Sequence, residues 1–188
     1  MKIYLDIDDT LINNNNYEMD EQYIISKPKP AKYLKEFLEC MLKNHDVYWL
    51  TTHCLGDAST AVSYMANSVS DEIVGLIKKI KPTKWNLTKS EAINMYEDFL
   101  WFDDDPTLED IENLKKHNKL DSLITVNLDE NPDILSEFLD QPVSCRGYVV
   151  DIFKKSYMLH IWTKPKISFG WHRKTDCPNK KIFGVQRY

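Results

Sequence analysis

The sequence has no long apolar run, no paired cysteine spacing and no internal repeat. Its apolar stretches fall well short of the roughly 18 to 20 residues that a membrane-spanning helix needs. The first residues lead directly into an acidic segment rather than a signal peptide, so we expect a cytoplasmic protein with no membrane partner. Four cysteines, at positions 40, 54, 145 and 177, lack metal-ligand spacing, which favours reduced thiols over a disulfide framework.

Charge is unevenly distributed along the chain. Residues 1–142 carry 14 Lys and Arg against 27 Asp and Glu, whereas residues 143–188 carry 10 against 2. This division predicts an acidic core domain over 1–142 and a basic, aromatic extension over 143–188, whose β-forming runs indicate a small antiparallel sheet. Such a basic segment either contacts nucleic acid or docks on the acidic part of its own chain.

Short apolar runs alternate with segments of helical periodicity through the first 140 residues. We expect strands at 3–5, 47–50, 99–102 and 123–126. We expect helices at 31–43, 58–67, 71–79, 108–118 and 132–139, and one that begins at Thr88 or Ser90. The asparagine-rich segment between residues 11 and 29 predicts a loop or small hairpin. This alternation predicts an α/β fold with a doubly wound, mostly parallel sheet, whose ligands gather at the carboxyl ends of the strands.

Polar side chains follow three of these strands. Asp6 and Asp8 come after the first, a pair of threonines after the second, and Asp103 and Asp104 after the third. Carboxylates at the end of a buried strand repel one another unless a cation or hydrogen-bond donors compensate, and Mg²⁺ is the natural compensator where phosphate is also bound. Taken singly, each acidic segment is also typical of a turn followed by a helix cap. Together with Lys89, the set predicts phosphoryl-transfer chemistry.

Four segments, in this order, resemble the motifs of the haloacid dehalogenase (HAD) superfamily. They are Leu-Asp-Ile-Asp-Asp-Thr-Leu at 5–11, Trp-Leu-Thr-Thr at 49–52, Lys-Ser-Glu-Ala-Ile at 89–93 and Trp-Phe-Asp-Asp-Asp-Pro at 101–106. The resemblance implies a Rossmann-like HAD core, a nucleophilic Asp6 that forms an aspartyl-phosphate, and Asp8 as general acid and base. It also implies that Thr51 binds the phosphoryl group and Lys89 neutralises it, with Thr52 and Lys84 as the alternatives at these two positions.

The same resemblance implies a magnesium site. Asp6, the backbone carbonyl of Asp8 and Asp103 would bind the ion, and Asp104 would contribute through water. The short spacing between motifs leaves no room for a large cap domain, and capless members of the superfamily often act on exposed phosphates of proteins or nucleic-acid ends. The segment at 101–105 is similar to HAD domains of RNA-repair proteins. The alternative is a non-catalytic HAD-fold protein that binds or assembles with partners through its basic extension.

Overall fold

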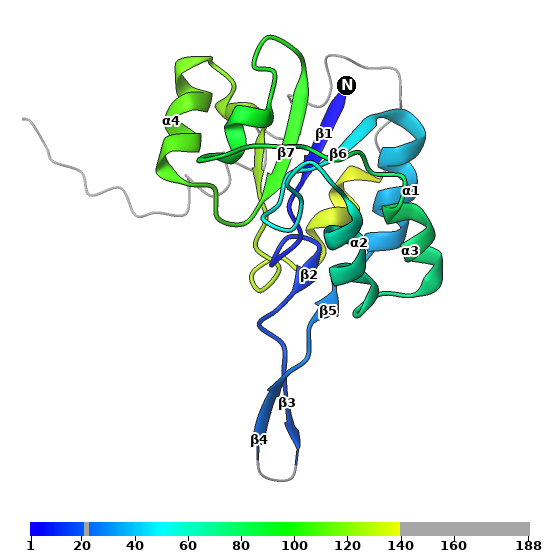
Figure 1. The fold of residues 1–188 in the computed structure, drawn as a ribbon. Helices are drawn as coiled ribbons and strands as arrows, with labels where there is room; N and C mark the ends of the chain where they lie inside the picture. The colour runs from blue at the N-terminus through cyan, green and yellow to red at the C-terminus, as the bar shows by residue number, and fades with distance from the viewer. Residues whose placement is uncertain (21–22, 140–188) are drawn as a thin grey trace, which may run out of the picture.

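A computed structural model describes residues 1–20 and 23–139, so the predicted basic extension at 143–188 lies outside the described residues. The core is a four-stranded, all-parallel sheet in the order β6-β1-β7-β8 (Figure 1). These strands are β1 (Lys2–Leu5), β6 (Asp46–Trp49), β7 (Phe99–Asp103) and β8 (Leu123–Thr125). The predicted α/β class and the parallel sheet are therefore confirmed.

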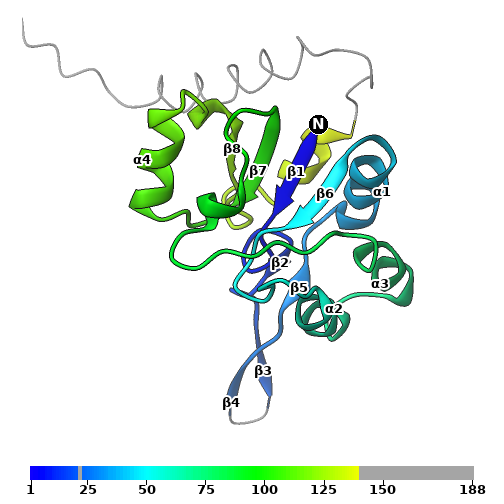
Figure 2. The same cartoon turned by 45° about the horizontal axis from the view of Figure 1, so that its top comes forward.

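Helices cover both faces of the sheet. Figures 1 and 2 show α1 (Leu34–Asn44), α2 (Ser59–Ala66) and α3 (Asp71–Ile77) on one side and α4 (Leu108–Lys116) on the other. Within β1, Ile3 and Leu5 belong to the buried cluster on the first side, and Tyr4 belongs to the second cluster. Because both faces are covered, the strands read as continuous apolar runs rather than alternating ones.

Between β1 and α1 the chain forms two antiparallel pairs, as the hairpin interpretation predicted. Strand β2 (Ile12–Asn13) pairs with β5 (Lys29–Pro30), and β3 (Tyr17–Asp20) pairs with β4 (Tyr23–Ser26) in a hairpin that projects from the body of the fold (Figure 1). Helix α1 begins at Leu34 rather than Ala31, because the Ala31 amide donates to the Leu11 carbonyl and Tyr33 has a left-handed φ of 60°.

Two segments that were predicted to be α-helices form short 3₁₀ segments instead. The segment after Thr88 forms only the 3₁₀ turn η1 (Lys89–Ala92), after which Ile93 is extended. Ile93 and Met95 are both buried in the second cluster, so packing at a period of two replaces a longer helix. The last predicted helix is the 3₁₀ segment η3 (Ile134–Phe138), in which Leu135 and Phe138 are buried three residues apart, a spacing that 3₁₀ geometry also places on one face.

The remaining connection, between α4 and β8, is the short 3₁₀ turn η2 (Leu120–Ser122). Every helix within residues 1–20 and 23–139 is too short or too polar to cross a membrane.

Candidate active site

The register of the sheet brings the predicted strand ends to one edge. Leu5 of β1 pairs with Trp49 on one side and Phe102 on the other, so the residues that follow these three strands become neighbours. The Asp6 amide continues the ladder by donating to the Phe102 carbonyl at 3.0 Å. As a result Asp6, Thr51 and Asp103 are all buried, with exposed fractions of 6, 0 and 0%.

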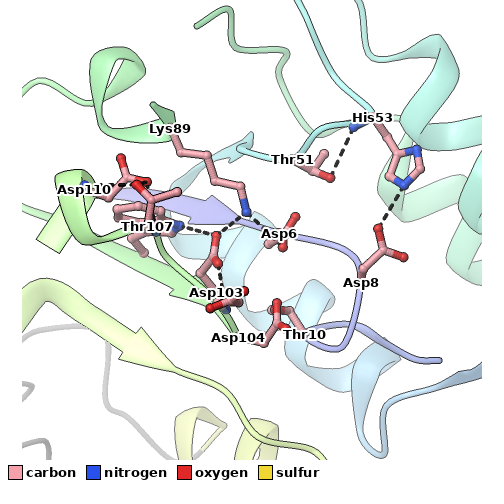
Figure 3. Close-up of polar contacts among 12 residues, drawn as sticks. Asp6, Asp8, Thr10, Thr51, His53, Lys89, Asp103, Asp104, Thr107 and Asp110 are labelled. Carbon is pink, nitrogen blue, oxygen red and sulfur yellow. Dashed lines mark hydrogen bonds and ion pairs between the residues drawn. The ribbon is translucent and has the colours of Figure 1, made fainter. Parts of the chain in front are cut away.

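Lys89 reaches this edge from η1. Its ammonium lies 3.0 Å from Asp6 Oδ2 and 2.6 Å from Asp103 Oδ2 (Figure 3). Burial acts to lower the pKa of Lys89, but the negative charges of Asp6 and Asp103 outweigh it and raise that pKa. Lys84 and Thr52, the alternatives left open by the sequence, are exposed, whereas Thr51 is buried beside Asp6.

Asp110 holds the turn that carries Lys89. Its fully buried carboxylate accepts hydrogen bonds from the Ser90 amide at 2.8 Å and from the Thr107 hydroxyl at 2.8 Å, which ties η1 to the start of α4. Sequence reasoning missed this residue. The Thr107-x-x-Asp110 spacing of a capping box marks the helix start, but nothing local indicates the second bond, which spans 20 residues.

Three carboxylates form a cluster of oxygen ligands. Asp6, Asp103 and Asp104 each offer one oxygen, and these atoms all lie within 4.8 Å of one another. Burial and the charge of Asp6 raise the pKa of Asp103 to about 7 and that of Asp104 to about 6. Lys89 therefore offsets only part of the repulsion. An oxygen-only group with excess negative charge fits a hard divalent cation such as Mg²⁺.

Further hydrogen bonds orient two of these carboxylates. Trp101 Nε1 donates to Asp103 Oδ2 at 3.0 Å, and the Thr10 hydroxyl donates to Asp104 Oδ1 at 3.5 Å. The Asp105 amide donates to Asp103 Oδ1 at 3.1 Å. Trp101 could have been found from the sequence, since residues two apart on a strand share a face.

The Asp8 side chain lies apart from this cluster. Its Oδ1 accepts from the Tyr64 hydroxyl at 2.6 Å and from Asn14 Nδ2 at 2.7 Å, and its Oδ2 lies 2.9 Å from His53 Nε2. Figure 3 shows the Asp8 carboxylate directed toward His53. Of the predicted residues, the structure thus gathers Asp6, Thr51, Lys89, Asp103 and Asp104, while the Asp8 carboxylate has its own partners.

These partners decide the charge of Asp8. Burial acts to raise its pKa, but the hydrogen bonds from Tyr64, Asn14 and His53 outweigh burial and lower it. The same bond to Asp8 raises the pKa of Tyr64 to about 12. Asp8 is therefore an anion at neutral pH, held by hydrogen bonds with Tyr64, Asn14 and His53.

Comparisons with protein-family models, with curated proteins and with solved structures found no match to this chain. The geometry of the site is therefore what indicates its chemistry.

Proposed function

We propose that this chain is a magnesium-dependent phosphatase with a Rossmann-like HAD core and Asp6 as its nucleophile. The observation that carries the proposal is the buried Asp6 carboxylate, which is paired with Lys89 at 3.0 Å and belongs to the oxygen cluster with Asp103 and Asp104. Charged groups are costly to bury, and a cluster of them at the carboxyl edge of a parallel sheet favours a functional explanation.

In the proposed reaction Asp6 attacks phosphorus. One oxygen of its carboxylate forms the new bond to phosphorus while the bond from phosphorus to the leaving oxygen breaks. Asp8, which is a carboxylate in the free protein, takes up the proton of the bound phosphate monoester monoanion and donates it to the leaving oxygen. Water then attacks the phosphorus of the aspartyl-phosphate, Asp8 accepts a proton from that water, and inorganic phosphate leaves with Asp6 restored as a carboxylate.

The other side chains bind and neutralise. The ammonium of Lys89, which is paired with Asp6, and the hydroxyl of the buried Thr51 would bind phosphoryl oxygens. Asp6, Asp103 and Asp104 would hold the divalent cation, with the Asp8 backbone carbonyl as a further candidate ligand. When bound, the cation offsets the repulsion between the carboxylates and an anionic phosphate.

We further propose an open site that acts on an exposed phosphate, such as that of a nucleic-acid end or a nucleotide. The short connections support this, because the β3–β4 hairpin is the main addition between β1 and α1. The excess of basic residues at 143–188 in the sequence supports a nucleic-acid substrate.

The test is phosphate release from free nucleotides, sugar phosphates, a phosphopeptide and 3′- and 5′-phosphorylated oligonucleotides, with magnesium. Wild type should release phosphate from at least one class and Asp6→Asn from none, whereas the matched variant Asp121→Asn, at an exposed carboxylate, should behave as wild type. Acid quenching with ³²P-labelled substrate should leave label on wild-type protein only. If wild type releases no phosphate from the whole panel, the proposal fails and the non-catalytic binding protein becomes the better explanation.

A further inference from the structure

Two aromatic side chains bind the carboxylate of Asp8 from elements distant in sequence. Tyr64 lies on α2 and His53 lies in the loop after β6, 56 and 45 residues from Asp8. Their rings are stacked, with centroids 3.9 Å apart and planes inclined by 14°. The local turn chemistry that explains Asn14, six residues from Asp8, does not account for these two contacts.

These contacts hold the Asp8 side chain through both of its carboxylate oxygens. Tyr64 holds Oδ1 at 2.6 Å, and His53 holds Oδ2 at 2.9 Å. The Asp8 side chain is 36% exposed and that of His53 25%, so both remain accessible to solvent. Without these partners, a partly exposed aspartate in a loop would sample several rotamers, and its orientation would have to be recovered in each catalytic cycle.

His53 also connects Asp8 to the phosphoryl-binding side of the site. Its backbone amide lies 3.4 Å from the Thr51 hydroxyl, to which it donates, while its ring contacts Asp8. One residue therefore contacts both the proposed phosphoryl-binding hydroxyl and the proposed general acid.

We propose that His53 and Tyr64 are positioning residues, which hold the Asp8 carboxyl group in the orientation that serves the leaving oxygen. The stacked Tyr64 ring sets the plane of the His53 imidazole, and the two polar groups then set the rotation of the carboxyl group. This proposal rests on the proposed phosphatase function. In this role both residues act through Asp8, which each of them contacts.

The test uses substrates that differ in their need for a general acid. Phenyl phosphate has a poor leaving group that requires protonation, whereas 2,4-dinitrophenyl phosphate has a good one that leaves without it. Tyr64→Phe and His53→Ala should lower kcat for phenyl phosphate by about 10- to 100-fold, a part of the gain that general acids supply, with little change for the dinitrophenyl ester and in KM. His53→Gln, which keeps a side-chain N–H donor, should recover part of the loss. Tyr96→Phe, at a tyrosine that is 90% exposed, is the matched control.

A double-variant comparison separates positioning from general damage. Because His53 acts through Asp8, adding His53→Ala to Asp8→Asn should cause no further loss. Equal losses for both substrates, or additive losses in the double variant, would overturn the proposal.

A structural readout applies whether or not the enzyme turns over. Should wild type release no phosphate from any substrate, the phosphatase proposal fails by itself. Crystal structures then decide the positioning: one Asp8 rotamer in wild type and several in His53→Ala would support it. An unchanged single rotamer in His53→Ala would refute it.

Discussion

Replacing Asp103 by asparagine should stabilise the metal-free protein above pH 7, although it removes a proposed ligand. The Asp103 carboxyl group is fully buried, and burial together with the charge of Asp6 raises its pKa from 3.8 to about 7. At about 1.4 kcal/mol per pKa unit, ionised Asp103 lowers the free energy of unfolding by about 4 kcal/mol at pH 8. Asparagine avoids this cost and keeps an oxygen for Lys89 and Trp101.

The substitution also has a cost. The Asp105 amide donates to Asp103 Oδ1, and the asparagine amide group cannot accept that bond, which removes about 1 to 2 kcal/mol. The net gain is therefore about 2 to 3 kcal/mol, which corresponds to a rise in Tm of roughly 5 to 10 °C for a chain of this length.

The dependence on pH has a definite sign. Because the pKa in the folded protein is raised, the folded state binds the proton more tightly than the unfolded state. The stability that the protonated group contributes is complete below pH 3.8 and is lost as the pH rises through about 7. The advantage of Asp103→Asn should therefore be absent near pH 4, apart from the lost Asp105 bond, and grow up to pH 8.

Thermal and urea denaturation of wild type and Asp103→Asn between pH 4 and pH 8, in EDTA and in millimolar magnesium, measure these quantities. Magnesium should raise the Tm of wild type at pH 8 much more than at pH 5, where Asp103 and Asp104 carry protons, and should have little effect on the variant. If the variant is less stable than wild type at pH 8 in EDTA, or if magnesium stabilises both proteins equally, the reasoning about a cation site is refuted.

Three further substitutions test the residues around the cluster. Trp101→Phe removes the indole donor to Asp103 and should weaken magnesium binding by about 10-fold or more, as measured by calorimetry. An unchanged affinity would contradict the orienting role of Trp101. Asp110→Ala should lower the free energy of unfolding by about 3 kcal/mol or more, and it should reduce activity by displacing the turn that carries Lys89. A variant that is as stable to urea as wild type would contradict the assigned hydrogen bonds. Thr51→Val keeps the buried shape but loses the hydroxyl; kcat should fall about 10²-fold with little change in Tm, and full activity would assign phosphoryl binding elsewhere.

The sheet and its polar edge could be predicted because each depends on local patterns. The apolar runs that end at Leu5, Leu50 and Phe102 mark buried strands, and parallel strands joined by helices must place their carboxyl ends at one edge. The acidic residues after the runs at Leu5 and Phe102 then meet by topology alone.

What could not be predicted depends on contacts between distant segments. Nothing near Asp8 in the sequence indicates Tyr64, which reaches it from α2, 56 residues further along the chain. The helix expected after Thr88 had favourable capping residues, but tertiary packing of Ile93 and the bond from Ser90 to Asp110 favoured a single turn. Local propensity is a weak prior wherever a short connection must satisfy such contacts.

The central position of β1 has a consequence for synthesis on the ribosome. Strand β1 pairs with β6 and β7, and β7 follows it by about a hundred residues. Because the ribosome adds about 5 to 20 residues per second, the nascent chain carries Asp6 for roughly 5 to 20 s before Asp103 is synthesised. During this time the apolar β1 has at least one unpaired edge, which exposes the nascent chain to aggregation. Translation speed between residues 50 and 103 should therefore affect the yield of folded protein more than speed near the start.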